Sequence, residues 1–190
     1  MNCPQQAADA ARARHDARYI SLASRKYAML KLVPYDDAVD LLDADHKAVK
    51  KMFMDYNALC DARARAPLRQ ALAQQIGKAL TVHAQIEEEL FYPEVRDAIG
   101  DDALMDAALQ EHAKAKEMIA LIESMDAGAT GYDATVQQLG MLIDAHVLAE
   151  REQMFLRARQ SALDLSGMAG PLYDRKRRLT GGAVRLKVQA

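Results

Sequence analysis

The sequence predicts an all-α protein: an up-down-up-down antiparallel four-helix bundle with an N-terminal helical extension and a basic C-terminal tail. Three observations predict this fold class. The helix-forming residues Ala, Leu, Glu, Lys, Arg and Gln dominate the 190 residues, whereas there are only 9 Gly and 5 Pro. Apolar side chains recur at steps of three and four along four long stretches. Short segments separate those stretches, which is typical of neighbouring antiparallel helices.

The first two helices have the clearest boundaries. The first is expected from Asp36 to about residue 61, and its inner face keeps the helical spacing throughout: Val39, Leu42, His46, Val49, Phe53, Tyr56 and Cys60. The second begins near Pro67, a residue that suits a first helical turn. Pro93 and then Gly100 end or bend it.

The third helix is expected from about Asp101, and the fourth follows a turn at residues 126–133 and fades beyond Leu163. We therefore assign residues 36–163 to the bundle. Residues 1–35, which are rich in Ala and Arg, form the extension. Residues 164–190 form the tail, because their final stretch DRKRRLTGGAVRLKVQA has lost the helical pattern.

Charge and cysteine content indicate the kind of compartment in which the protein works. Residues 36–163 carry 13 Lys and Arg against 23 Asp and Glu, so an acidic middle lies between two basic ends. Cys3 and Cys60 make no disulfide framework, which suits a reducing compartment. The sequence contains no apolar run of about 18 residues, and residues 1–35 lack the apolar core of a secretory signal. We therefore expect a cytoplasmic protein with no membrane partner.

The basic tail is the only feature that suggests nucleic acid. Its four consecutive basic residues are Arg175, Lys176, Arg177 and Arg178. They lack interleaved aromatic residues, so a solvated tail is favoured over contact with nucleic acid. The sequence carries no signal for an oligomeric state.

Six polar residues interrupt the apolar faces of the four helices: His46, His83, Glu87, His112, His146 and Glu150. In an antiparallel bundle, residues equally far from a shared connection lie at one height. His46 and His83 lie about 15 and 16 residues from the loop near residue 61, or about 22 Å at 1.5 Å per residue. The same measure pairs Glu87 with His112 and His112 with His146 across the next two turns. The four histidines should therefore form one layer.

A metal would explain this layer. A single histidine on an apolar face is usually a hydrogen-bonded core residue, but an isolated buried carboxylate is costly unless it is paired. Six ligands exceed the four of a tetrahedral zinc, and four imidazoles are too rich in nitrogen for calcium or magnesium. Imidazole with carboxylate suits iron, manganese, cobalt or zinc. The count indicates a dinuclear centre, for which iron is the favoured metal.

These residues and their flanking segments, HKAVKKMF, HAQIEEELFYPEV, EHAKAKEMI and HVLAEREQMF, resemble the hemerythrin-like, or HHE cation-binding, family over about residues 36–160. Oxygen-carrying hemerythrins have two histidines on the third helix, whereas this chain offers only His112. The last carboxylate is Glu150, four residues after His146. The set is more similar to bacterial hemerythrin-like proteins and to the di-iron domain of repair-of-iron-centres proteins, which argues against reversible oxygen carriage.

The resemblance implies two iron ions (Fe2+/Fe3+) joined by an oxo or hydroxo group. If Glu87 and Glu150 also bridge, each iron keeps a position open for O2, NO or peroxide. We expect a cytoplasmic non-haem di-iron protein that binds or senses O2 or NO. Catalase-like turnover of peroxide and consumption of NO stay open, and no residue is assigned to a catalytic step. The alternatives are iron donation for repair of damaged iron centres and a metal-free bundle that acts as an interaction module.

Tyr92 is a further candidate ligand. It lies five residues beyond Glu87, and helical side chains slant toward the N-terminus, so its ring can reach back toward the layer. Pro93 should distort the local turn. A tyrosine at the bundle rim that hydrogen-bonds a neighbour is the favoured alternative. Glu88 and Glu111 adjoin the ligands in sequence. A solvated role is favoured for them over hydrogen bonding to a ligating imidazole.

Overall fold

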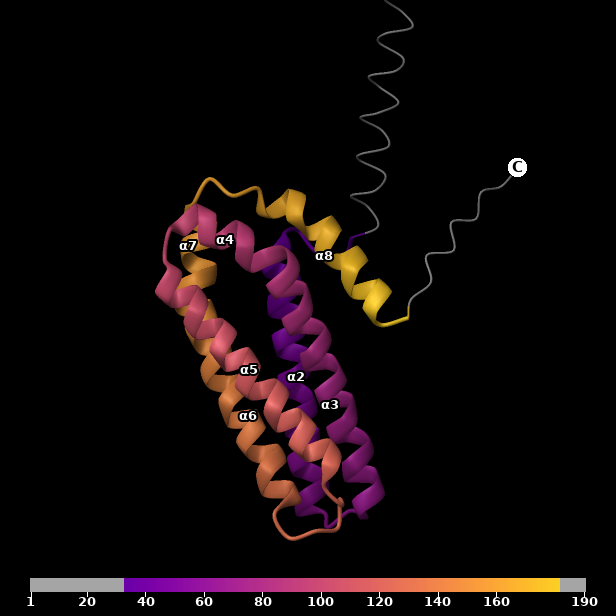
Figure 1. Ribbon diagram of the computed structural model, residues 1–190. Helices are drawn as coiled ribbons and strands as arrows, with labels where there is room; N and C mark the ends of the chain where they lie inside the picture. Colours follow the sequence, from indigo (N-terminus) through magenta and orange to yellow (C-terminus); the bar gives the residue numbers. More distant parts are fainter. Residues whose placement is uncertain (1–32, 182–190) are drawn as a thin grey trace, which may run out of the picture. The chain divides into compact units, whose positions relative to one another are not determined.

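The computed structural model describes residues 33–181, and Figure 1 shows their helices. In chain order, the α-helices are α2 (Ala38–Asp61), α3 (Ala66–Ile86), α4 (Tyr92–Ile99), α5 (Asp102–Ser124), α6 (Tyr132–Ala149), α7 (Leu156–Gln160) and α8 (Leu165–Leu179). Two π-helical turns, η1 (Glu87–Phe91) and η2 (Glu150–Phe155), join α3 to α4 and α6 to α7. The chain divides into the units Met1–Pro34 and Tyr35–Ala190, and this fold belongs to the second.

The four-helix bundle predicted from the sequence is confirmed. Its four helical segments are α2, the continuous run α3–η1–α4, then α5, and the run α6–η2–α7 (Figure 1). Helix α2 packs on α3, and α5 packs on α6. Residues 33–181 contain no strand, and none of their helices is long and apolar enough to cross a membrane. Most of the predicted extension, residues 1–35, lies outside the described residues.

Local chemistry fixes where the helices begin and end. Asp37 accepts a hydrogen bond from the Asp40 backbone N–H at 2.8 Å and caps α2. Asp101 caps α5 in the same way, through the backbone N–H of Leu104 at 3.0 Å. Gly100 ends α4 with a φ of 62°, a left-handed conformation that favours glycine. These ends keep the connections short and hold the helical segments antiparallel.

The apolar core has two parts. One cluster lies toward the start of α2 and includes Leu42, Ile86 and Phe91. The other lies toward the loops at the far end and includes Tyr56 and Ile76. The polar layer predicted from the sequence separates them, so the bundle is stabilised by apolar packing on both sides of a ring of imidazoles and carboxylates.

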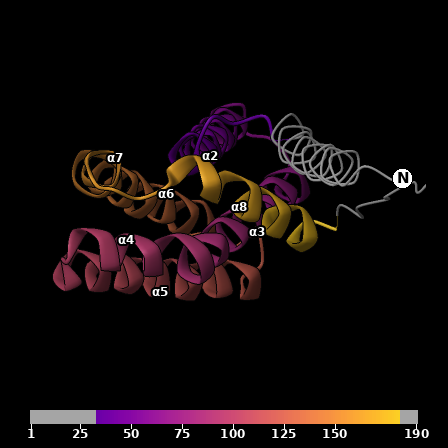
Figure 2. The ribbon, with the colours of Figure 1, turned by 90° about the horizontal axis from the view of Figure 1, so that it is seen from above.

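Helix α8 corrects the prediction of a tail over residues 164–190. It contacts α2, α3 and η1, and Figure 2 shows it across the end of the bundle. Leu165, Ala169 and Leu172 are buried at helical spacing, and Asp164 caps the helix. The sequence pattern is short and is interrupted by Pro171, which obscures it. Residues 182–190 of the predicted tail lie outside the described residues.

Candidate metal centre

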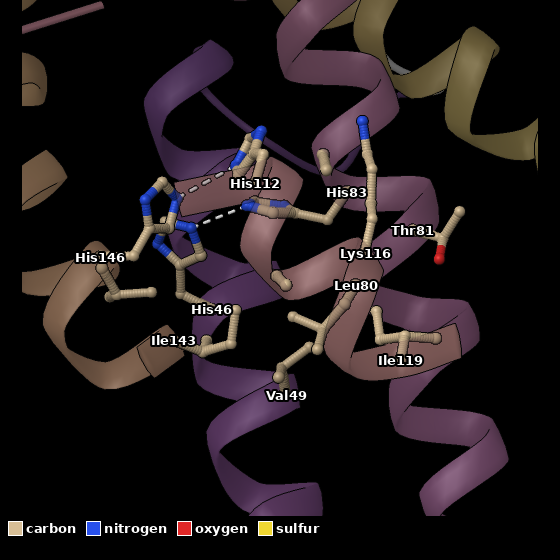
Figure 3. A pocket seen from close by; sticks show the side chains of 13 residues that line it. His46, Val49, Leu80, Thr81, His83, His112, Lys116, Ile119, Ile143 and His146 are labelled. Carbon is tan, nitrogen blue, oxygen red and sulfur yellow. Dashed lines mark hydrogen bonds between the residues drawn. The ribbon is translucent and has the colours of Figure 1, made fainter. Parts of the chain in front are cut away.

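All six predicted polar residues meet in the interior of the bundle. His46 comes from α2, His83 from the last turn of α3, His112 from α5 and His146 from the last turn of α6. Glu87 and Glu150 are the first residues of the two π-helical turns. None of the six is more than 5% exposed. Figure 3 shows the four imidazoles turned toward one another.

The imidazoles form two pairs. In the first pair, the Nε2 atoms of His46 and His83 lie 2.8 Å apart. In the second, the Nε2 atoms of His112 and His146 lie 3.2 Å apart. We call these the α2/α3 half and the α5/α6 half of the site. Every Nε2 atom faces inward, which is the orientation that a ligand needs to share a metal with its neighbour.

The two glutamates lie between the halves. Glu87 Oε2 is 3.2 Å from His83 Nε2 and 3.4 Å from His112 Nε2. Glu150 Oε2 is 3.2 Å from His46 Nε2 and 3.4 Å from His146 Nε2. Each carboxylate therefore reaches one imidazole in each half, which is the position of a ligand that bridges two ions.

A pair of divalent cations fits these donors. Within residues 33–181, the buried atoms Glu87 Oε1 and Glu150 Oε2 have no hydrogen-bond partner, and neither has His46 Nδ1. Two residue groups have ligand atoms close enough to hold an ion, namely His46, His83, Glu87 and Glu150, and then Glu87, His112 and His146. Imidazole nitrogen with carboxylate oxygen is a donor set for a transition metal. Orphaned buried carboxylate oxygens are otherwise costly.

The two glutamates and the imidazoles shift one another's pKa values. Burial alone would lower the pKa of His83, but the charge of Glu87 and the contacts with Asp45 and Glu87 raise it to about 10. Burial likewise opposes the positive charge on His112, yet Glu87 raises its pKa above the ordinary value. Burial would raise the pKa of Glu87, but His83 and His112 hold it well below its usual range. A cation bound to the imidazole nitrogens would displace such protons.

The π-helical turn η1 directs Tyr92 into the site. Pro93 lacks an N–H, and in a regular helix its ring would meet the carbonyl of Glu89. The wider turn instead joins the Tyr92 N–H to the Glu87 carbonyl, so Tyr92 lies one helical turn beyond Glu87. Tyr92 is 3% exposed. Sequence reasoning placed Tyr92 near the site and expected Pro93 to distort the local turn, but it did not predict a π-helical turn.

The phenol of Tyr92 touches both glutamates and one histidine. Its OH lies 2.8 Å from Glu150 Oε1, 3.3 Å from His112 Nε2 and 3.5 Å from Glu87 Oε2. It is a hydrogen-bond donor in the metal-free protein, because burial and the two carboxylate charges raise its pKa well above the ordinary value. The contact with His112 places the phenol beside the α5/α6 half.

Carboxylates lie behind three of the four imidazoles. Glu88 Oε1 lies 2.9 Å from His112 Nδ1, and Glu111 Oε2 lies 2.8 Å from His146 Nδ1. The sequence analysis favoured solvated roles for Glu88 and Glu111, and these contacts correct it. Asp45 Oδ2 lies 3.6 Å from His83 Nδ1. Sequence reasoning missed Asp45, whose only signal is its position next to His46.

The fourth imidazole has an aromatic neighbour. Phe155 ends the second π-helical turn, five residues after Glu150, and its ring stacks on His46 with centroids 5.8 Å apart and planes 8° apart. Phe155 thus occupies the position after Glu150 that Tyr92 occupies after Glu87. One half of the site has a phenol beside it, and the other has a ring without a polar atom.

Two hollows adjoin the layer. A cavity of about 20 Å³ lies among the four histidines and aliphatic side chains that include Val49, Leu80 and Ile143 (Figure 3). It holds about one water-sized molecule. A wider groove of about 380 Å³ lies along α5 and reaches His146 and Glu150 past Ala107. The site is therefore within reach of small molecules from the α5/α6 side.

Comparison with known proteins identifies the family. The family model for the hemerythrin HHE cation binding domain matches residues 37–158, which contain all six polar residues of the layer. The chain belongs to the hemerythrin HHE family. It is a metal-binding helical protein, and its metal ligands are to be sought in the layer between the two core clusters.

Two similar proteins extend the comparison. A solved structure, the hemerythrin HHE cation binding domain-containing protein of Mycobacterium kansasii, has the same fold with a TM-score of 0.65. It is 19% identical, and the match covers 80% of this chain and 94% of that one. A DNA nickase of Nostoc sp. is 28% identical over 122 residues, 64% of this chain. The match spans 33% of that relative's length.

Proposed function

We propose that this chain is a non-haem di-iron protein that binds O2, NO or peroxide. Its two irons would lie in the two halves of the layer, one on His46 and His83 and the other on His112 and His146. Glu87 and Glu150 would bridge them. The observation that carries the proposal is the position of each glutamate, whose Oε2 lies 3.2 to 3.4 Å from one imidazole in each half.

Counting donors supports a reactive site. Two imidazoles and two shared carboxylates give each ion four protein ligands, fewer than iron accepts in such sites. Iron with an open position supplies the redox and Lewis-acid chemistry for a small ligand. The apolar cavity of about 20 Å³ next to the imidazoles limits such a ligand to a few atoms and disfavours a larger one.

Tyr92 is proposed as a further ligand of the α5/α6 half. Its OH lies 3.3 Å from His112 Nε2 and donates to Glu150. A cation there would favour the phenolate, just as a metal deprotonates other ligands. Because Glu150 would itself bridge the two ions, the proton of the phenol would be released to solvent.

The outer carboxylates would hold the imidazoles in the ligand tautomer. With Nε2 turned inward, the proton of His112 belongs on Nδ1, where it donates to Glu88, and that of His146 donates to Glu111. Phe155 stacks on His46 and covers one face of its ring. These contacts fix the orientation of the rings before a ligand arrives.

The test is metal content joined to an optical spectrum, on protein purified without a polyhistidine tag. We expect about two irons per chain, because the site offers two groups of ligands. We also expect the spectrum to change when O2, NO or peroxide is added. Evolution of O2 from peroxide, or loss of NO with turnover, would make the protein an enzyme; a single stoichiometric change would make it a carrier or sensor.

A matched variant separates the proposal from its alternatives. Tyr56→Phe alters a buried polar residue of the far core cluster and should leave iron content unchanged, whereas Glu87→Gln should reduce it. Iron that is bound but passes to an iron-free acceptor protein would favour iron donation. Protein that folds normally and binds no transition metal would refute the proposal and favour a metal-free interaction module.

A further inference from the structure

Helix α8 lies outside the matched family region, residues 37–158. Two of its side chains nevertheless form ion pairs with bundle residues that lie close in sequence to the proposed ligands. Arg175 pairs with Glu89 at 2.6 Å. Lys176 pairs with Asp45. The sequence analysis expected both basic residues in a solvated tail. They instead fasten α8 to the bundle at two points, and only one of these points adjoins a proposed metal ligand.

Asp45 stands between α8 and that ligand. Its Oδ1 accepts from the Lys176 ammonium, and its Oδ2 faces His83 Nδ1 at 3.6 Å. The Asp45 side chain is 12% exposed and that of His83 is 6% exposed, so water has little access to the contact. The other half repeats the arrangement, because Lys116 lies 2.8 Å from both oxygens of Glu88 and Glu88 contacts His112.

We infer that Lys176 is a positioning residue for His83, acting through Asp45, so that docking of α8 and metal binding in the α2/α3 half stabilise each other. The inference rests on the proposed function, because it assigns His83 to one of the two ions. It adds a residue from outside the family's matched region to the machinery that sets metal affinity.

The physical reason is the proton on His83. A cation on Nε2 leaves Nδ1 protonated, and a buried N–H without an acceptor is costly. Asp45 is the carboxylate nearest to that N–H, at an ion-pair distance of 3.6 Å, and Lys176 holds one of its oxygens so that the other faces the ring. Neither Nδ1 has a hydrogen-bond partner among residues 33–181, but a carboxylate lies within ion-pair distance of the Nδ1 of His83 and not of that of His46.

The two halves therefore differ in the carboxylates that lie behind their imidazoles. The α5/α6 half has close carboxylates behind both imidazoles, at 2.9 and 2.8 Å, and both come from the bundle itself. The α2/α3 half has one carboxylate at a longer distance, and a residue of α8 holds it. The ion in the α2/α3 half is accordingly the one that responds to α8.

The test is an anaerobic titration of metal-free protein with Fe(II), followed by calorimetry. Wild-type protein should bind two ions. Lys176→Met should weaken one of the two binding steps by about tenfold, the lower end of the effect of removing a partner of a ligating histidine. Asp45→Ala should weaken the same step at least as much. Lys176→Arg, which keeps the charge, should restore the affinity. A His46→Ala variant keeps only the α5/α6 half intact. The binding step that it loses is therefore the step of the α2/α3 half.

Arg175→Met is the matched control. It removes the neighbouring ion pair of α8 and should leave both steps unchanged. Hydrogen exchange gives a second readout: because coupling is reciprocal, Fe(II) should slow exchange of the α8 amides in wild type and not in Lys176→Met. Suppose that wild-type protein binds two ions. The inference alone would then be overturned if Lys176→Met left the affinity of both binding steps unchanged, or if Lys176→Met and Arg175→Met lowered it equally. A wild type that binds no ion would overturn the proposed function as well.

Discussion

Tyr92 donates a hydrogen bond across the bundle to Glu150, with 2.8 Å between the phenol oxygen and Oε1. The two residues are 58 positions apart and come from the two runs that contain a π-helical turn. Tyr92 lies five residues after Glu87, so the contact links the segment of one proposed bridging glutamate to the other, Glu150. It places an ionisable oxygen beside one half of the layer only.

Tyr92→Phe tests the role of that oxygen. We expect iron-loaded wild-type protein to show a visible phenolate-to-iron absorption band and the variant to lack it. Loss of the hydrogen bond should also lower the free energy of unfolding of the metal-free protein by about 1 kcal/mol. Tyr132→Phe, in the far core cluster, is the control. A band that survives in Tyr92→Phe would remove Tyr92 from the ligands.

The proposed bridging position of the glutamates predicts that glutamate and histidine variants lose different amounts of iron. Glu87→Gln and Glu150→Gln should each weaken both ions, because each carboxylate reaches both halves. His46→Ala should weaken only the ion of the α2/α3 half, leaving about one iron per chain. Iron content after dialysis against a weak chelator measures this. Equal stoichiometry in Glu150→Gln and His46→Ala would contradict the bridging arrangement.

The pKa of His83 predicts how the stability of the metal-free protein depends on pH. The folded state raises this pKa from its ordinary value of 6.5 to about 10, so the folded protein binds the proton more tightly than the unfolded chain. The resulting stability is complete below about pH 6.5 and is lost as the pH rises toward 10.

Thermal unfolding of metal-free wild type and of His83→Gln across this pH range isolates the effect. Wild type should lose stability with rising pH more steeply than the variant, whose side chain does not titrate. Parallel curves would show that His83 binds no extra proton in the folded state. In iron-loaded wild type the difference should disappear, because the cation replaces the proton.

The groove along α5 predicts a route to the site. Ala107 lines it, and a larger side chain there should obstruct access to His146 and Glu150. Ala107→Leu should slow the reaction of the iron-loaded protein with azide or peroxide severalfold, at unchanged iron content. Ala113→Leu is the control, since Ala113 is exposed on the same helix and does not line the groove. Identical rates in the two variants would rule out this route.

The layer could be predicted from the sequence because the rise of a helix per residue is fixed. Once the turns near residues 61, 99 and 130 are located, the heights of His46, His83 and His112 follow from counting. The identity of the ligands follows from the cost of burying a carboxylate such as Glu87 without a partner. These steps need no knowledge of side-chain packing.

The features that sequence reasoning missed depend on contacts between helices. Counting along a helix gives height but does not show that Asp45 faces His83 or that Glu111 faces His146. The π-helical turn η1 changes which face Tyr92 occupies. Pro93, just beyond it, indicates a distorted turn but not its type, and η2 has no proline in it. Helix α8 is short, and its buried positions are too few to establish a period.

The most direct test of the account is a crystal structure of the iron-loaded protein with anomalous differences measured at the iron absorption edge. The account predicts two peaks in the layer, one beside the Nε2 atoms of His46 and His83 and one beside those of His112 and His146. Glu87 and Glu150 should both lie between them. A single peak, or none, in crystals grown from protein soaked with excess Fe(II) would contradict the di-iron centre.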